Sequence, residues 1–255
     1  MAPLAVLVWI PTVLVLDRFA GVGQQALLGV GTWVLLLALL RREDGLTRAQ
    51  VAVVVGYATL VEYTFSAVLG VYVYRLGGAA GVPAFVPPGH GLVYLAALCL
   101  GRSARFRARP PLTVALAAAG VTGYAVWGLV VSPRLDVLGA FWAGCLLLFL
   151  WRGRAPLVYA GAFVVVTYLE IWGTSLGTWT WQAHDPTGVI AIGNPPSGAA
   201  GGYGFFDAAA LLLAPLLLRM VVRLRSSPAL RARSAGSAAA HAPGGPAPLP
   251  EAGLP

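Results

Sequence analysis

Charged side chains are scarce in this sequence, and lysine is absent altogether. Only 10% of the 255 residues are charged, against about 25% in soluble domains, while 58% are hydrophobic. A soluble core cannot bury that much apolar surface, so the composition excludes an ordinary soluble domain. The net charge of +8 would suit nucleic acid, but the arginines stand between long apolar runs and form no single basic patch. We therefore expect a membrane protein with no nucleic-acid partner.

The sequence is also poor in residues that hold metals and cofactors. Its two cysteines, Cys99 and Cys145, lie inside apolar runs, where they fit small packing residues better than a disulfide or a metal site. Of three histidines, His241 lies near the C-terminus, which leaves too few for a histidine-rich metal cluster. No phosphate-binding glycine loop or nucleophile motif is present. The sequence predicts neither a metal nor a cofactor.

Long apolar segments dominate what is present. A membrane span needs about 20 residues, with a range of about 17 to 25. The sequence holds eight candidates, of which the first and fourth are short: roughly 3–16, 25–40, 50–72, 90–101, 112–131, 135–151, 156–176 and 203–222. The predicted fold is an all-α, polytopic membrane bundle of about eight transmembrane helices.

Arginine placement predicts the orientation of that bundle. Cytoplasmic loops collect arginine, whereas translocated loops do not. With eight spans and both termini inside, fourteen of the seventeen arginines are cytoplasmic, and only Arg18, Arg75 and Arg134 lie outside. We therefore predict a transmembrane domain over 1–225 in the cell membrane. Residues 226–255, rich in Ala, Pro, Gly and Ser, are predicted to be a disordered cytoplasmic tail.

The two halves of the chain share an ordered set of features. Residues 89–98 align without gaps on 202–211, with five identities in ten. Upstream, each half has a glutamate, a glycine followed by two alternating aromatics, and a double proline, and the spacing differs by one residue. We predict two parallel four-helix repeats, about 1–101 and about 110–225, whose matching motifs face each other across a central cavity.

Three acidic residues lie well inside the apolar segments, away from the first residues of each. Glu62 falls near the predicted bilayer midplane, and Glu170 and Asp207 are shallower. A carboxyl group in hydrocarbon is costly and usually faces the bundle interior, where desolvation favours its protonated form. We predict catalytic roles for all three as proton donors or acceptors. The alternative is structural: they bond neighbouring helices or pair with Arg75 or Arg134.

Two pairs of aromatic residues follow the glutamates, Tyr72 with Tyr74 and Trp179 with Trp181. Residues at i and i+2 share one side of an extended chain but separate on a helix. They are predicted to wall the substrate site with π faces that stabilise a cation. The alternative is an aromatic belt at the membrane interface.

Four more residues complete the predicted site. His90 follows a Pro-Pro-Gly sequence at the start of a helix, where a neutral imidazole is favoured and could relay a proton. The alignment pairs His90 with Tyr203 and Tyr94 with Asp207, which places both tyrosines in the same cavity as substrate contacts. Asn194, before a second double proline, is a further candidate contact, although the turn around it would also cap the last helix.

One stretch carries a family resemblance. Glu62 is followed by Gly-x-Tyr-x-Tyr at 70–74, Leu-Gly at 76–77 and Val-Pro at 82–83. This order resembles carotenoid-biosynthesis membrane proteins related to the bacterioruberin-type 1,2-hydratases. The resemblance implies a membrane enzyme whose substrate is an isoprenoid lipid.

The sequence therefore predicts an integral membrane enzyme that hydrates or cyclises an isoprenoid or carotenoid-like lipid by acid catalysis. A buried carboxylic acid would protonate an alkene, and the aromatic residues would shield the cation. Two alternatives stay open. The first is a proton-coupled transporter or lipid flippase with midplane carboxyl groups. The second is a structural or assembly protein of the membrane. The oligomeric state is left open.

Overall fold

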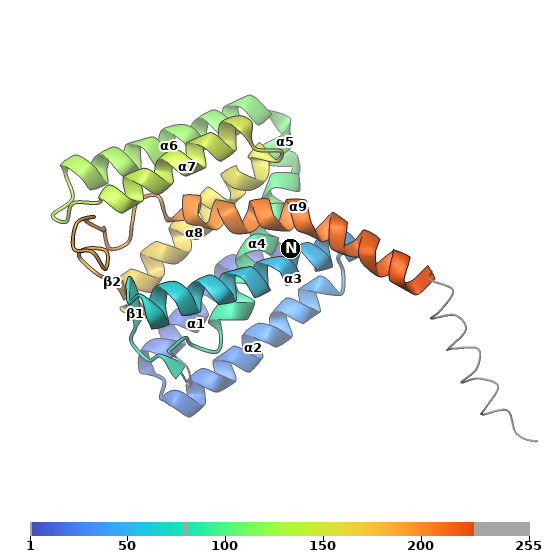
Figure 1. Cartoon of the computed structure of the whole chain (residues 1–255), viewed down its shortest axis with the longest axis horizontal. Helices are drawn as coiled ribbons and strands as arrows, with labels where there is room; N and C mark the ends of the chain where they lie inside the picture. Colours follow the sequence, from blue (N-terminus) through green and yellow to red (C-terminus); the bar gives the residue numbers. More distant parts are fainter. Residues whose placement is uncertain (1, 79–80, 227–255) are drawn as a thin grey trace, which may run out of the picture. The chain divides into compact units, whose positions relative to one another are not determined.

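The structure is a computed structural model that describes residues 2–78 and 81–226. Apart from one small sheet, the regular elements in these residues are helices (Figure 1). The longer helices are α1 (Ala2–Phe19), α2 (Val22–Leu40), α3 (Gly45–Glu62), α4 (Val86–Arg102), α6 (Pro110–Val130), α7 (Val137–Arg152), α8 (Pro156–Ser175) and α9 (Ala199–Ser226). The shorter elements are α5 (Ala104–Ala108), a π-helix (Tyr63–Val68), β1 (Tyr72–Tyr74) and β2 (Trp179–Trp181).

The helices begin where the sequence provides suitable first residues. Asp44 and Asp136 are the N-caps of α3 and α7, and each carboxylate accepts a backbone N–H three residues later. Proline opens α6 and α8 at Pro110 and Pro156, where the missing N–H costs nothing. The double proline before His90 likewise lies in the first turn of α4, so that helix starts four residues before the predicted boundary.

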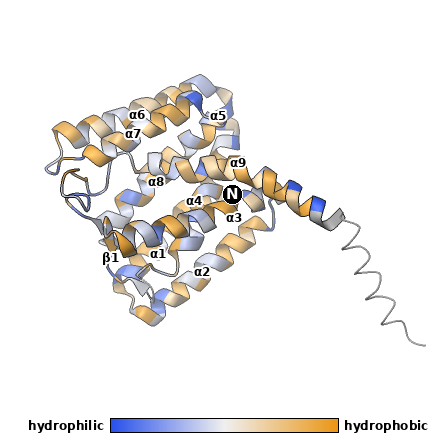
Figure 2. Ribbon diagram, in the orientation of Figure 1, coloured by the Kyte–Doolittle hydropathy of each residue, from blue (hydrophilic) through white to orange (hydrophobic). Residues whose placement is uncertain are grey.

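Six of the described helical segments are long and apolar enough to cross a membrane, and they include α1, α2, α6 and α8. The other two are α3 with its π-helical extension and α9 as far as Arg223. Figure 2 shows apolar residues along most of their length. Helix α7 is shorter, with 16 residues, and α4 has 17. A polytopic helical membrane protein is thus confirmed in outline, whereas the count of eight spans stays a prediction.

Helix α4 is central because nearly every residue from His90 to Leu98 is buried. It packs along α8, and glycines allow the two backbones to approach closely. A Cβ on Gly161 would overlap the carbonyl oxygen of Ala97, so this contact requires glycine. Burial on all sides suits the uniformly apolar sequence of α4.

The chain divides into two units, and the described residues up to Pro215 form the first. All contacts described below lie within this unit. The last turns of α9, from Leu216 to Ser226, belong to the second unit. The predicted cytoplasmic tail lies, after its first residue, outside the described residues.

Arginine contacts join loops that the sequence assigns to the same side of the membrane. Arg102 lies 3.9 Å from the Glu43 carboxylate and donates to Thr47 Oγ1 at 3.2 Å, which brings together the ends of α2 and α4. At the other end, Arg75 lies 3.7 Å from the Asp17 carboxylate and also donates to the Asp17 carbonyl. These contacts show which helix ends lie together, while the orientation in the membrane stays a prediction.

The two alternating aromatic motifs are extended and pair with each other. β1 and β2 form an antiparallel sheet in which Val73 lies opposite Thr180, and each tyrosine of β1 lies opposite a tryptophan of β2. Motifs about 108 residues apart in the sequence thus lie side by side. The extended form of the prediction is correct, so each aromatic pair shares one side of its strand.

The π-helix accounts for the one-residue difference between the two halves. Tyr72 lies ten positions after Glu62, and Trp179 lies nine positions after Glu170. The π-helix, Tyr63–Val68, lies directly after Glu62, and its wider turn takes up one extra residue. Both glutamates can therefore stand at comparable distances from the sheet.

Candidate functional site

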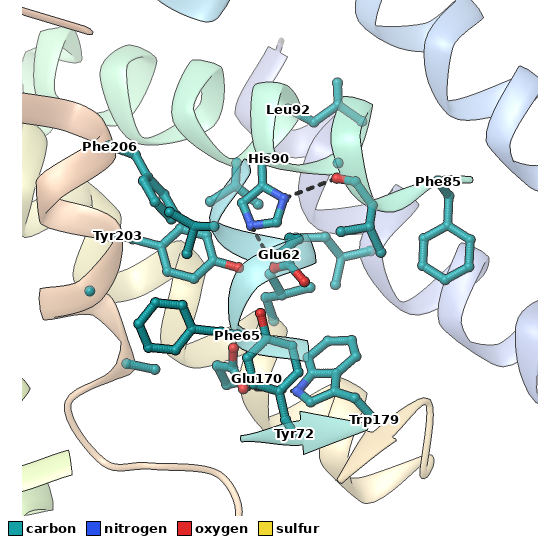
Figure 3. A pocket seen from close by; sticks show the side chains of 18 of the residues that line it. Glu62, Phe65, Tyr72, Phe85, His90, Leu92, Glu170, Trp179, Tyr203 and Phe206 are labelled. Atoms are coloured by element: carbon teal, nitrogen blue, oxygen red, sulfur yellow. Dashed lines mark hydrogen bonds and ion pairs between the residues drawn. The ribbon is translucent and has the colours of Figure 1, made fainter. Parts of the chain in front are cut away.

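A cavity of about 300 Å³ lies where α3, α4, α8, α9 and the sheet meet (Figure 3). Side chains from α1, α2 and α7 complete its wall. Eight of the eleven residues predicted from the sequence line it, so the predicted residues gather in one place. They are Glu62, Tyr72, Tyr74, His90, Glu170, Trp179, Trp181 and Tyr203.

Glu62 is the last residue of α3 and is 7% exposed. Its Oε2 accepts a hydrogen bond from the Tyr74 hydroxyl at 2.7 Å. Its Oε1 lies 3.3 Å from Nε2 of His90 (Figure 3). The carboxyl group is therefore held from two sides, by a hydroxyl donor and by an imidazole that can exchange a proton.

His90 has a defined tautomer in this setting. Its Nδ1 lies 3.0 Å from the carbonyl oxygen of Val86, and a carbonyl can only accept, so Nδ1 carries a hydrogen. Proton gain and loss therefore take place at Nε2, which faces Glu62. The Tyr203 ring stacks on the imidazole with centroids 5.2 Å apart, which fixes the ring plane.

Glu170 is held by two tryptophans. Its Oε2 accepts from the indole N–H of Trp179 at 3.0 Å and of Trp181 at 3.1 Å, and the residue is 5% exposed. An indole N–H can only donate, so this oxygen acts as an acceptor. The two donors fix the orientation of the carboxyl group. In the described residues the second oxygen, Oε1, accepts no hydrogen bond and is left available in the cavity.

Gly173 makes the contact between Glu170 and Trp179 possible, because a Cβ there would overlap the Trp179 indole. We expect Gly173→Ala to displace the indole and break its hydrogen bond to Glu170. The measurement is tryptophan fluorescence of the purified protein, where the emission of Trp179 should shift. Gly144→Ala is the matched control, since a Cβ at Gly144 meets nothing within 4 Å. Identical spectra for both variants would contradict this packing.

The strand tyrosines remain hydrogen-bond donors over the accessible pH range. Burial, together with the charge of the Glu62 carboxylate, raises the pKa of Tyr72 and Tyr74 well above the ordinary value for tyrosine. Both phenols therefore stay protonated. Tyr74 can support a negative charge on Glu62 by donating, but it is not suited to remove a proton from a substrate.

No arginine lines the cavity in the part of the chain that the structure describes. Arg75 is bound to Asp17, and Arg134 donates to the Trp181 carbonyl at 2.8 Å. Of the structural alternative, pairing of Glu62 or Glu170 with these arginines is therefore not found. Hydrogen bonds to side chains of neighbouring elements are found for both glutamates. No group of three or more metal-binding side chains is found in the described residues.

Three predicted residues lie outside the cavity lining. Asp207 is 3% exposed, and its Oδ2 has no hydrogen-bond partner in the structure; Tyr94 is 1% exposed, with an equally unpartnered hydroxyl. Asn194 accepts from the Trp181 backbone N–H at 3.1 Å and so holds β2 in place. The structure thus gives Asn194 a positioning contact in place of the predicted substrate contact, and roles for Asp207 and Tyr94 stay predictions.

Much of the apolar wall of the cavity is not predicted from the sequence. Trp142 of α7 and Trp9 of α1 line the cavity, as do Tyr57, Phe205 and Phe206. These residues stand alone in apolar helices, where an aromatic residue is more often a packing or interface residue. They differ from other aromatic residues only in lying on the helix face that meets the cavity, and the packing of the helices determines which face that is.

Comparisons of this chain with described protein families, with characterised proteins and with solved structures find no match.

Proposed function

We propose that the protein is a membrane enzyme that protonates a carbon–carbon double bond of an isoprenoid-like lipid and completes a hydration or cyclisation. The supporting observation is that two buried carboxyl groups, Glu62 and Glu170, line one aromatic cavity to which no arginine among the described residues contributes. One group can give a proton while the other takes one up. The family resemblance noted from the sequence points to the same substrate class.

The Glu62–His90 pair supplies the proton. With Nδ1–H bound to Val86, Nε2 is the nitrogen that can exchange a proton with Glu62 Oε1, which lies 3.3 Å away. That proton adds to the less substituted alkene carbon, the π electrons form the new C–H bond, and a tertiary carbocation remains. The conjugate base is stabilised by the hydroxyl of Tyr74.

Glu170 acts as the base. Its Oε2 is bound by two indoles, which leaves Oε1 to accept a proton. In hydration, Oε1 takes a proton from the water molecule whose oxygen bonds to the cation. In cyclisation, a second double bond attacks the cation and a neighbouring C–H loses its proton to Glu170. Either route leaves the enzyme ready to pass a proton back to Glu62.

The cavity walls suit a positively charged hydrocarbon intermediate. Tyr72 packs against Trp181 with ring centroids 4.5 Å apart, and Trp142 lies 5.8 Å from Trp181 by the same measure. Aromatic faces attract cations, and the low dielectric of the site strengthens that attraction. The walls also limit the access of water, and this protects a reactive carbocation from uncontrolled attack.

The cavity has a side that a membrane lipid can reach. Two of its lining residues are well exposed, Tyr57 of α3 at 39% and Phe205 of α9 at 46%. Apolar residues on the same helices are also exposed, among them Leu60 and Leu212. A substrate dissolved in the bilayer could therefore enter between α3 and α9 without crossing a polar surface.

Lipid analysis tests this function directly. We expect cells that carry the gene to convert a discrete isoprenoid, which should accumulate when the gene is deleted. Mass spectrometry of extracted pigments and polyprenoids would detect it as a mass difference of one water for hydration, or as an isomer for cyclisation. A gene for Glu43→Gln, a carboxyl group outside the cavity, should restore the profile. Identical profiles with and without the gene would refute the proposal.

We also propose that all eight long helices cross the membrane, with both termini in the cytoplasm, as two repeats. The register of the sheet supports the repeat, because Val73 and Thr180 occupy equivalent positions and lie opposite each other. A single cysteine placed at Arg105 should react with an impermeant thiol reagent only from the cytoplasmic side. One placed at Gly188 should react only from the outside. The opposite pattern would reverse the topology.

A proton-coupled transporter is a second candidate, favoured by one observation. Asp207 and Tyr94 have buried oxygens without hydrogen-bond partners in the described residues, and they lie outside the cavity lining, one helical turn along from Tyr203 and His90. Polar groups therefore continue past the cavity. Uptake driven by a proton gradient in vesicles would support this function, particularly if the lipid profile were unchanged.

A further inference from the structure

We infer that the cavity binds lipid-soluble organic cations, of which an alkyl trimethylammonium is the simplest, and that Glu62 and Glu170 hold the positive charge. The inference concerns the same cavity as the proposed function. It adds a class of ligand that the reaction does not require, and it can be tested without any turnover.

The charge of the lining is the first argument. The titratable groups that face the cavity are Glu62 from α3, His90 from α4 and Glu170 from α8, together with tyrosines of α3, β1 and α9. The lining residues from α1, α2 and α7 carry no charge. With His90 neutral, the cavity holds up to two negative charges and no fixed positive charge. An organic cation would balance them.

The aromatic faces beside the carboxyl groups are the second argument, because they suit a cation that lacks hydrogen-bond donors. Glu62 already accepts from Tyr74, and Glu170 accepts from both strand tryptophans. A quaternary ammonium offers no N–H and needs only negative charge and aromatic faces around it. The tilted pair of Tyr72 and Trp181 provides such faces beside Glu170. A quaternary ammonium can therefore lie beside the carboxyl groups without breaking these hydrogen bonds.

The shape of the lining is the third argument. Most of the remaining lining is apolar and aromatic, and the well-exposed Tyr57 and Phe205 lie on its lipid-accessible side. An alkyl chain can therefore lie toward the hydrocarbon while the charged head lies between the carboxyl groups. Simple inorganic cations lack the apolar part that this wall requires.

Binding should displace a proton. A cation beside Glu62 favours the carboxylate, so the proton that Glu62 can exchange with His90 Nε2 leaves. Acid then competes with the ligand, and affinity should fall as the pH is lowered. A neutral ligand of the same shape should show no such dependence.

The test compares two ligands that differ by one charge. Radiolabelled dodecyltrimethylammonium is titrated onto the protein in nanodiscs, and 2,2-dimethyltetradecane, in which carbon replaces nitrogen, is the neutral competitor. We expect saturable binding of one cation per chain, and competition by the neutral compound at least about tenfold weaker than by the unlabelled cation. Glu62→Gln and Glu170→Gln should each weaken cation binding by about tenfold or more. Glu43→Gln should not change it.

Several outcomes would overturn the inference. Equal competition by the neutral compound would remove the role of charge, and wild-type affinity in both glutamine variants would remove the role of the carboxyl groups. A radiolabelled form of the neutral compound provides the folding control, because its partitioning into the lining should persist in a folded variant. If cations fail to bind while lipid conversion continues, the inference is wrong and the proposed reaction stands. If cations bind but no lipid is converted, the inference stands and the proposed reaction is wrong.

Discussion

Glu62→Gln is expected to lower the conversion of the lipid substrate by about 10²- to 10⁴-fold, the usual contribution of a general acid. Glutamine keeps the volume of the side chain and can still accept from Tyr74, whose hydroxyl lies 2.7 Å from Oε2. It cannot carry the transferable proton. The rate constant is measured in membranes that contain equal amounts of each variant, with the accumulated lipid as substrate.

Two substitutions next to Glu62 distinguish its role as a proton donor from the hydrogen bonds that position it. Tyr74→Phe removes one hydrogen bond to Glu62 but leaves the acid in place, so its loss of activity should be much smaller. His90→Gln removes the group at 3.3 Å that returns the proton, so turnover should slow after a first cycle. Wild-type rates in Glu62→Gln would exclude this acid, whatever the other variants show.

Glu170→Gln tests the other half of the chemistry. Its amide oxygen can still accept from Trp179 or Trp181, so β2 should keep its position. Removal of the base should leave protonation intact but block proton uptake. In deuterated water, substrate recovered from this variant should therefore gain deuterium by reversible protonation while product formation stops. Absence of both would show that Glu170 serves an earlier step.

The carboxyl groups of the site could be found from the sequence because of where they stand. Glu62 and Glu170 interrupt apolar runs, and a charge at such a depth must face the interior. Alternation of aromatics after each glutamate indicated an extended segment, and the structure places both segments in one sheet. These features follow from local spacing and from the cost of burying charge.

Other features depend on packing that spacing does not specify. The alignment correctly brought His90 and Tyr203 together, but Tyr94 and Asp207, each four residues further along, are one helical turn deeper and lie beyond the cavity lining. Alignment gives a position along a helix, and only the closeness of neighbouring helices determines how far a cavity extends. The eight spans, the repeat and the isoprenoid substrate remain predictions.

Asp136→Ala is expected to cause the largest loss of stability among single substitutions in the loops that are predicted to lie outside the cell. Asp136 is 2% exposed and accepts from three backbone N–H groups: Gly139 at 2.9 Å, Gly193 at 2.8 Å and Ser197 at 2.6 Å. It joins the start of α7 to the loop before α9. Because water cannot reach the three N–H groups, loss of their acceptor should lower the free energy of unfolding by about 3–5 kcal/mol.

The matched comparison is Asp185→Ala. Asp185 also accepts from three backbone N–H groups, those of Thr187, Val189 and Ile190. The Thr187 hydroxyl, together with these backbone donors, lowers the pKa of the Asp185 carboxyl group to about 2. Its loop is open to solvent, so water replaces the lost acceptor and the thermal midpoint in detergent should change little. Asp136→Ala should lower that midpoint sharply, and a similar small shift in both variants would contradict the argument from burial. Asp136 also holds the backbone of Gly193, which precedes Asn194, and the Asn194 side chain accepts from the Trp181 backbone N–H. The fluorescence of the cavity tryptophans should therefore change in Asp136→Ala and stay the same in Asp185→Ala.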